Sequence, residues 1–338
     1  MKADPKQAHV SLTWKHGSPL VACAFDPKGR YVVSSGQDYS LQRWDIPSGK
    51  KIQWEAHDSW VRDFAFTPDG ETFISCGSDD KIIFWQTAAK EMKPIRTIDA
   101  HKGWIRAIDM AKDGKTFVTG ANDRLVKLWN TENGELIREF KGHELDVYSV
   151  LLHPDGKHIL SGDQGGTIIQ WEIATGKNVR SFDAKPLLTN NTQGVRYGGV
   201  RGLAMSPDNK HLACCGLHKA SNPLGAVQEP IALLFDWTSG KKVRTHTADG
   251  LRAIGWQIRW LNDGTLLCGA GGSAGSFLVF WRPDADKEYH RFKVADNARD
   301  MDLHSDSIQV ATPHYDGNLR ISKLMPNPNP PKKDAKKK

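Results

Sequence analysis

Four residue types recur together along the first half of the chain in an order that could do chemistry. The complete sets are His16, Ser34, Asp38 and Trp44; His57, Ser75, Asp79 and Trp85; and His101, Thr119, Asp123 and Trp129. Histidine, serine and aspartate can form a hydrolase triad, which needs one activated serine beside a pocket and an oxyanion site. Because this set returns three times at fixed spacing, each time with an indole N–H to satisfy, it indicates a structural role.

A fourth, incomplete set contains His143, Ser161 and Trp171, and it has Gly165 where the aspartate is expected. Later units lose most of the pattern and carry Cys214 and Cys268 at the serine position. Buried polar groups need hydrogen-bond partners, so we expect these later units to be less stable.

Metal and phosphate chemistry find little support in the sequence. Cys214, Cys215 and His218 lie close in sequence, but adjacent strand residues point to opposite faces, and no second Cys/His pair follows at zinc spacing. A phosphate-binding loop of the G-x-x-x-x-G-K-[ST] type is absent from the sequence. The glycine-rich run Gly269–Gly275 lies between two predicted strands and is interpreted as a long turn. We therefore expect no catalytic residue, metal or cofactor.

The net charge of +7 raises the question of nucleic-acid binding. The last eight residues carry five lysines and one aspartate, a net charge of about +4, so the remaining body is close to neutral. Residues 326–338 are rich in proline and lysine and are predicted to be a disordered basic tail. Such a tail favours only weak, nonspecific contact with nucleic acid.

Five cysteines in apolar, strand-like segments suit reduced, buried thiols rather than a disulfide framework. The sequence also contains no unbroken apolar run of about 18 residues that could cross a bilayer, and its beginning lacks the apolar core of a signal peptide. We expect a cytoplasmic protein without a membrane partner.

A repeat of about 40 residues organises the chain. Trp44, Trp85, Trp129 and Trp171 follow one another at separations of 41, 44 and 42 residues. A short turn recurs between apolar segments, as Pro27-Lys28-Gly29, Pro68-Asp69-Gly70, Lys112-Asp113-Gly114, Pro154-Asp155-Gly156, Pro207-Asp208-Asn209, Asn262-Asp263-Gly264 and Ser305-Asp306-Ser307. Seven such turns predict seven units of short strands.

With its Trp44-Asp45 dipeptide and this period, the chain resembles the WD-repeat (WD40) family over residues 9–325. The resemblance implies an all-β fold, a seven-bladed β-propeller of four-stranded antiparallel blades. It also implies that the His, Ser/Thr, Asp and Trp sets form buried hydrogen-bond chains. Val10–Trp14 is expected to complete blade seven, and residues 1–8 to be an N-terminal tail.

One position opens the first strand of successive units and is rich in arginine and aromatic residues. Counting back from each turn gives Arg62, Arg106, Tyr148, Arg201, Trp256 and Arg299, with Trp60 and Trp104 two residues earlier in two units. In the family these positions surround the mouth of the channel. Arginine pairs with carboxylate and phosphate, so the pattern predicts a site for an acidic or phosphorylated partner; ordinary repeat residues packing along the strand end remain the alternative.

Three longer connections are expected to elaborate one face: Asp183–Gly199, Gly216–Pro230 and Gly269–Ser276. Loops of this length commonly serve a function, although drift in a tolerant loop also explains them. We interpret the chain as a non-catalytic scaffold for partner proteins or peptides, and as a candidate subunit of a larger complex. Two alternatives stay open: a ligand-binding or enzymatic propeller using the channel, and a nucleic-acid-associated protein acting through its tail.

Overall fold

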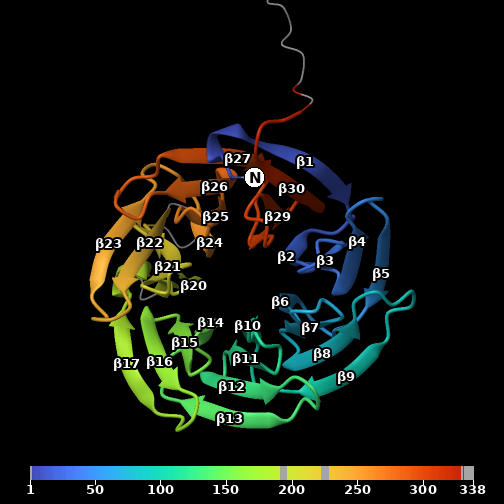
Figure 1. The fold of residues 1–338 in the computed structure, drawn as a ribbon, viewed down its shortest axis with the longest axis horizontal. Coiled ribbons are helices and arrows are strands. Elements are labelled where there is room, and N and C mark those ends of the chain that lie inside the picture. The colour runs from blue at the N-terminus through green and yellow to red at the C-terminus, as the bar shows by residue number, and fades with distance from the viewer. Residues whose placement is uncertain (1, 191–195, 222–227, 329, 331–338) are drawn as a thin grey trace, which may run out of the picture.

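The computed structural model describes residues 2–190, 196–221, 228–328 and 330. Across these residues, seven antiparallel sheets of four strands each are arranged around a central axis (Figure 1). The predicted all-β, seven-bladed propeller is therefore confirmed. The described helices are two 3-10 turns, η1 (Pro5–Gln7) and η2 (Lys185–Leu187), and no helix in this part of the chain has the length and apolar character needed to span a membrane.

Each of the first four blades runs outward from the channel in sequence order. Blade one contains β2 (Leu20–Phe25), β3 (Tyr31–Gly36), β4 (Ser40–Asp45) and β5 (Lys51–Glu55). Blade two contains β6 (Val61–Phe66), β7 (Thr72–Gly77), β8 (Lys81–Gln86) and β9 (Pro94–Asp99). Blade three contains β10 (Ile105–Met110), β11 (Thr116–Ala121), β12 (Leu125–Asn130) and β13 (Leu136–Lys141). Blade four contains β14 (Val147–Leu152), β15 (His158–Asp163), β16 (Thr167–Glu172) and β17 (Asn178–Asp183).

The last three blades complete the ring. Blade five contains β20 (Gly202–Met205), β21 (His211–His218), β22 (Glu229–Asp236) and β23 (Lys242–Thr247). Blade six contains β24 (Ile254–Trp260), β25 (Leu266–Gly272), β26 (Gly275–Trp281) and β27 (His290–Ala295). Blade seven combines β28 (Asp302–Leu303), β29 (Gln309–Pro313) and β30 (Asn318–Leu324) with β1 (Ala8–Lys15), which pairs antiparallel with β30 as the outermost strand.

The hydrophobic core lies between neighbouring blades. Val33 and Leu41 of blade one, for example, pack in one cluster with Phe73 and Trp85 of blade two. Every residue of β2 is buried, because an innermost strand has a neighbouring blade on each side. The outermost strands are largely exposed, and Ile95 in β9 is 56% exposed. Each buried large apolar side chain contributes about 1.5–3 kcal/mol, so the contacts between blades dominate stability.

The seven predicted turns share one backbone conformation. Their third residue lies in the left-handed region in every case, with φ between 58° and 81°, at Gly29, Gly70, Gly114, Gly156, Asn209, Gly264 and Ser307. Glycine and asparagine adopt this conformation at the lowest steric cost, which explains the recurring P-D-G pattern.

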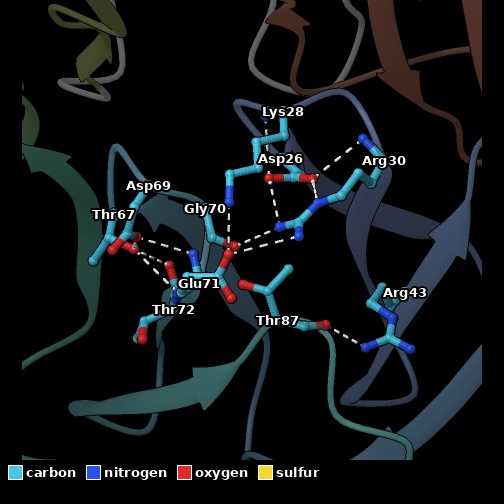
Figure 2. Close-up of polar contacts among 10 residues, drawn as sticks. All are labelled: Asp26, Lys28, Arg30, Arg43, Thr67, Asp69, Gly70, Glu71, Thr72 and Thr87. Carbon is cyan, nitrogen blue, oxygen red and sulfur yellow. Dashed lines mark hydrogen bonds and ion pairs between the residues drawn. The ribbon is translucent and has the colours of Figure 1, made fainter.

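Side chains in these turns also connect adjacent blades (Figure 2). Asp26 is fully buried and accepts a 2.7 Å hydrogen bond from Nε of Arg30. Arg30 also donates through Nη2 to the carbonyl of Gly70 in blade two, at 2.7 Å. Lys28 Nζ lies 2.6 Å from Oε1 of Glu71. The first turn of blade one is thereby attached to the first turn of blade two.

The glycine-rich run in blade six differs from the prediction of a long turn. Strands β25 and β26 stay paired as far as Gly272 and Gly275, so the connection is a tight turn of two residues. A Cβ added at Gly271 would lie 1.7 Å from the carbonyl oxygen of Ala298. The glycines therefore allow a strand to approach blade seven closely, and the sequence alone did not reveal that contact.

The first and last strands of the described chain, β1 and β30, lie in blade seven. The backbone N–H of Asp4 donates to the carbonyl of Leu324 at 2.8 Å, and η1 leads directly into β1. Of the predicted basic tail at residues 326–338, residue 329 and residues 331–338 lie outside the described residues.

Candidate functional site

Residues predicted for the mouth of the channel lie at equivalent places in the innermost strands. In β2, β6, β10, β14 and β24 the pairing register slips near the start of the strand, which marks a β-bulge. The residues at these slips are Val21, Arg62, Arg106, Tyr148 and Trp256. A bulge leaves its extra residue unpaired and changes the direction in which its side chain points. These five residues, with Arg201 and Arg299, line one axial cavity of about 780 Å³.

Arginine and aromatic side chains alternate around this opening. The guanidinium carbon of Arg62 lies 4.9 Å from the ring centre of Trp60 and 5.3 Å from that of Trp104. The guanidinium carbon of Arg106 lies 5.0 Å from the ring centre of Trp104 and 4.9 Å from that of Tyr148. Each of these two cations is therefore positioned between two aromatic rings.

Arg201 continues the series, 4.4 Å from the ring centre of Tyr148 and 5.1 Å from that of Trp256. Arg299 is exposed and lines the same cavity. The structure thus brings all eight predicted mouth residues together around one opening. We call this set the mouth ring: Trp60, Arg62, Trp104, Arg106, Tyr148, Arg201, Trp256 and Arg299.

Positive charge in the mouth ring is not neutralised by the protein. Burial, with the charges of Arg106, Arg299 and Arg201, lowers the pKa of Arg62 to about 10. Burial likewise lowers the pKa of Arg201 to about 10. Within the described chain, no carboxylate lies at ion-pair distance from these four guanidinium groups. Arg62 and Arg201 therefore remain cationic at neutral pH.

The hydrogen-bond partners of these arginines are neutral or missing. Nε of Arg62 donates to Oγ of Ser78, and Nε of Arg106 donates to Oδ1 of Asn122, both at 2.8 Å. Nε of Arg201 is buried and has no hydrogen-bond partner among the described residues. The terminal nitrogens of these side chains are therefore oriented while their charge stays available to an anion.

Carboxylates occupy the channel wall further along the innermost strands, and sequence reasoning missed them. Each accepts a hydrogen bond from a backbone N–H of the next blade: Asp63 from Ile108 (3.0 Å), Asp109 from Leu152 (2.7 Å), Asp300 from Cys23 (2.9 Å) and Asp302 from Phe25 (2.9 Å). Burial raises the pKa of Asp63 to about 8 and that of Asp109 and Asp300 to about 6. The available signal was an aspartate directly after Arg62 and Arg299.

In blade two, the recurring polar set forms one buried chain of hydrogen bonds. Ser75 Oγ lies 2.8 Å from Nε2 of His57 and accepts a 2.9 Å hydrogen bond from Nε1 of Trp85. The other ring nitrogen of His57, Nδ1, lies 2.9 Å from Oδ2 of Asp79. Burial alone would raise the pKa of Asp79, but the hydrogen bond from His57 lowers it below its usual value.

Blade three repeats this geometry with threonine. Thr119 Oγ1 lies 2.8 Å from Nε2 of His101 and accepts from Nε1 of Trp129 at 2.9 Å. Nδ1 of His101 lies 2.9 Å from Oδ2 of Asp123. Burial lowers the pKa of His101, although the aspartate opposes that shift. The polar side chains thus tie the loop before the blade to its inner strands.

Comparison with known proteins agrees with this architecture. The family model described as WD domain, G-beta repeat matches residues 9–45, 49–86, 92–130 and 134–172. The chain therefore contains four WD40 repeats. The last matched segment ends at residue 172, with strand β16 of blade four. Blade four is also the last blade that has a histidine, a serine, an aspartate and a tryptophan in the polar set.

Curated WD40 relatives are similar to only part of this chain. One subunit of chromatin assembly factor 1 from Gallus gallus is 25% identical over 183 residues, covering 52% of this chain and 27% of that protein. Protein groucho of Drosophila melanogaster is 23% identical over 185 residues, covering 53% of this chain and 25% of that protein. Transcription initiation factor TFIID subunit 5 of Caenorhabditis elegans is 26% identical over 159 residues, covering 47% of this chain and 24% of that protein. The alignments thus span about a quarter of each relative's length.

The prediction that the polar set of blade four lacks its aspartate is wrong. Asp163, two residues before Gly165, places Oδ2 2.9 Å from Nδ1 of His143. Its Oδ1 accepts from the backbone N–H of Gly165 at 2.8 Å. Ser161 lies 2.6 Å from His143 Nε2 and accepts from Trp171 at 2.7 Å. An aspartate at the end of β15 can therefore replace one within the turn, because its carboxylate reaches the same imidazole.

Blade one departs from the predicted set in another way. Ser34 donates to Oε1 of Gln42 at 2.7 Å and accepts from Nε1 of Trp44 at 2.9 Å, but it makes no direct hydrogen bond with His16. His16 instead faces Asp38 through Nε2, at 2.9 Å, and the amide of Gln42 lies 3.3 Å from the same nitrogen. The correction follows from residue 42, where a buried glutamine pairs across from Ser34 and separates the hydroxyl from the imidazole.

Later WD40 blades use other polar contacts. Nε1 of Trp281 in blade six donates to the carbonyl of Thr247 at 2.8 Å. In blade seven, His314 lies 2.8 Å from Oγ1 of Thr312 and 2.7 Å from the carbonyl oxygen of Asp296. Burial lowers the pKa of His314 to about 4. The expectation that these blades are less stable stays a prediction.

The predicted insertions are described only in part. In Asp183–Gly199, η2 leads into a hairpin of β18 (Leu188–Asn190) and β19 (Arg196–Gly198), and Leu187 is buried between blades four and five; residues 191–195 lie outside the described residues. In Gly216–Pro230, strands β21 and β22 pair as far as His218 and Glu229, and residues 222–227 lie outside the description. Their use as a binding face stays a prediction.

The cysteines behave as small core residues. All five are free and buried, and burial raises the pKa of Cys214 well above its usual value. Cys214 lies opposite Leu203 and Leu233 in the sheet, while Cys215 places its thiol 3.6 Å from the carbonyl oxygen of Gly255. A thiol at the serine position of a WD40 blade thus packs in the core.

Proposed function

We propose that this WD40 propeller is a non-catalytic scaffold that holds partner proteins at its mouth ring, which binds an acidic or phosphorylated segment of the partner. The observation that carries the proposal is the convergence of four guanidinium groups on one cavity with no carboxylate at ion-pair distance in the described chain. An anionic partner offsets the mutual repulsion of these cations.

The mouth ring has the properties of an interface anchor. Its rings hold Arg62, Arg106 and Arg201 in place, so a partner need not order long flexible side chains on binding. Tryptophan, tyrosine and arginine are also the residues that most often dominate binding energy at protein interfaces. Trp104, which is 45% exposed, offers such a surface at the rim.

A hydrolytic role for the recurring His, Ser and Asp residues is disfavoured by their contacts. Ser75 is fully buried, its hydroxyl is shared between His57 and Trp85, and both nitrogens of His57 are engaged. A nucleophile needs access to its substrate and a free lone pair directed at it. These residues therefore support the non-catalytic proposal.

The relatives support the scaffold class in a general way. Two of their names describe subunits, of chromatin assembly factor 1 and of the transcription initiation factor TFIID. We extend this to the proposal that the present chain also acts within a larger assembly. Its five free, buried thiols are compatible with a reducing compartment, and we propose a cytoplasmic location.

The proposal is tested by fluorescence polarisation with three labelled peptides of one length: a polyglutamate, a phosphoserine peptide and its unphosphorylated form. The wild-type protein is compared with R62Q/R106Q/R299Q, which leaves the buried Arg201 unchanged. We expect at least one anionic peptide to bind the wild type, and the triple variant to bind it about tenfold more weakly or worse.

The matched control is K115Q/K157Q/K210Q, which removes the same charge at exposed turns away from the mouth. We expect this variant to bind within about twofold of the wild type, since distant surface charges are screened by salt. Equal weakening by both variants would show nonspecific attraction. Binding of no anionic peptide by the wild type would contradict the proposed ligand class.

A further inference from the structure

A second group of side chains, whose atoms could act as metal ligands, lies at the opposite end of β14 from the mouth ring. The turn between β14 and β15 carries His153, Asp155 and His158, whose three ligand atoms all lie within 4.8 Å of one another. Nδ1 of His153 is 3.0 Å from Oδ2 of Asp155, and Nδ1 of His158 is 2.7 Å from the same oxygen. Two imidazole nitrogens thus converge on one carboxylate oxygen.

Hydrogen bonding around His153 leaves it incompletely satisfied. The backbone N–H of Asp155 lies 3.2 Å from Nδ1 of His153 and can donate to it when this nitrogen is unprotonated, and Oδ2 of Asp155 lies 3.0 Å from the same nitrogen. An unprotonated Nδ1 and a carboxylate oxygen are both acceptors, so the short distance between them needs a positive centre, either a proton on Nδ1 or a metal ion. Nε2 of His153 is buried without a hydrogen-bond partner among the described residues. Nε2 of His304 in blade seven is also buried without such a partner, so this feature alone does not distinguish the two turns.

Packing fixes one ligand and leaves the others accessible. The ring of His153 stacks on Trp237 of blade five, with ring centres 4.2 Å apart and an interplanar angle of 13°, and its side chain is 5% exposed. The side chains of Asp155 and His158 are 31% and 22% exposed. Tetrahedral zinc ligands lie about 3.4 Å apart, so the two Nδ1–Oδ2 distances of 3.0 and 2.7 Å would lengthen by roughly half an ångström around an ion.

Blade seven contains a natural comparison for this turn. Nδ1 of His304 lies 3.1 Å from Oδ2 of Asp306, as in blade four. Gln309 takes the place of the second histidine, and its Nε2 donates to the same carboxylate oxygen at 2.9 Å. The His–Asp pair alone is therefore a way of stabilising the turn. His158 is the residue that gives blade four a second nitrogen ligand.

We propose that His153, Asp155 and His158 bind one divalent transition-metal ion of the zinc type, with water completing its coordination. Imidazole nitrogen and a single carboxylate favour zinc, nickel or copper over calcium and magnesium, which prefer several oxygen ligands. Because His153 packs on Trp237, the bound ion stabilises the contact between blades four and five. This site is independent of the mouth ring.

Isothermal titration calorimetry of the tag-free, full-length protein with zinc chloride, after removal of metal by a chelator, tests the proposal. We expect one ion per wild-type chain, and binding weakened at least tenfold in H158Q. The variant H304Q changes the equivalent histidine of blade seven and should bind zinc as the wild type does. Absence of zinc binding by the wild type, or equal affinity in wild type and H158Q, would overturn the assignment.

Thermal unfolding supplies a control for the fold. Without metal, H158Q and the wild type should unfold at the same temperature, because the introduced amide can make the hydrogen bond that Gln309 makes in blade seven. Excess zinc should raise the midpoint of the wild type and leave that of H158Q unchanged, since an ion stabilises only a protein that binds it when folded. An equal rise in both proteins would contradict the site.

Discussion

At the scale of single residues, one buried hydroxyl holds each polar set together. Ser75 donates to Nε2 of His57 while accepting from the indole of Trp85, which leaves Nδ1 of His57 to donate to Asp79. The hydroxyl therefore satisfies two buried groups at once and fixes the tautomer of the histidine. Buried polar groups that lose a partner keep the cost of their desolvation.

Replacing Ser75 with alanine should accordingly destabilise the protein by about 1–3 kcal/mol, because both the imidazole and the indole lose a partner. The matched control is Ser322→Ala, since Ser322 is also fully buried but its hydroxyl has no hydrogen-bond partner among the described residues. Urea unfolding followed by tryptophan fluorescence measures both. A destabilisation by S322A as large as that by S75A would show that packing, not hydrogen bonding, determines the effect.

Residue types in these sets could be predicted from the sequence, but their exact contacts could not. Period and spacing pointed to His143 and Ser161 in blade four. They did not show that Asp163 supplies the carboxylate, because several backbone paths reach the same imidazole. In blade one, the cross-strand neighbour of Ser34 determined the outcome, and that neighbour is known only once the strand register is known.

At the scale of elements, aspartate side chains accept hydrogen bonds from the unpaired edges of the innermost strands. Asp63 in β6 accepts from the backbone of β10, and Asp109 in β10 accepts from the backbone of β14. An innermost strand has no further strand toward the channel, so these side chains satisfy N–H groups that would otherwise face it. Burial, together with the charge of Asp300, raises the pKa of Asp63 to about 8.

This shift predicts a pH dependence of stability. The pKa of Asp63 is higher in the folded protein than the value of about 4 in an unfolded chain, so the folded state binds the proton more tightly. Stability from this group is fully present below about pH 4 and is lost as the pH rises through about 8. Asp63→Asn should remove this loss while keeping an acceptor for Ile108.

The thermal midpoint of D63N minus that of the wild type should therefore increase between pH 5 and pH 9, as measured by differential scanning fluorimetry. Asp300 and Arg259, whose charges act on Asp63, are present in both proteins and serve as an internal control. If the thermal midpoints of D63N and the wild type change with pH in parallel over this range, the raised pKa of Asp63 is contradicted.

Sequence periodicity predicted the strands of each blade well, because the strands bury residues in a regular pattern. It failed at Gly269–Gly275, where glycines serve close packing within paired strands and not a turn. The channel carboxylates were also missed. Their partners are backbone groups of the next blade, which are 45 residues away in sequence for Asp63, 43 for Asp109 and 277 for Asp300 and Asp302, and no local pattern reveals them.

At the scale of the whole molecule, strands from both ends of the chain share one sheet. β1 pairs antiparallel with β30 along most of its length, from Ala8 with Leu324 to Lys15 with Asn318. Trp14 of β1 stacks on Trp44 of blade one, with ring centres 5.7 Å apart. The first strand therefore contacts both blade seven and blade one (Figure 1).

Deleting residues 1–15 should lower the thermal midpoint or cause aggregation, because it exposes an edge of β30 and removes a tryptophan from the contact with blade one. Adding a synthetic peptide of residues 4–16 should restore the midpoint of the truncated protein, as calorimetry would show. A truncated protein as stable as the full chain would mean that β1 contributes little to the ring.

Site-specific photo-crosslinking in native cell extract tests the mouth ring most directly. A photoreactive phenylalanine derivative replaces either Trp104 at the mouth or Ile137 on the outer strand β13; these side chains are 45% and 49% exposed, so they are matched in accessibility. The account predicts that the Trp104 variant captures a partner protein and that adding R62Q/R106Q/R299Q abolishes the capture. Capture through Ile137 but not through Trp104 would place the partner on the outermost strands of the propeller and contradict the account.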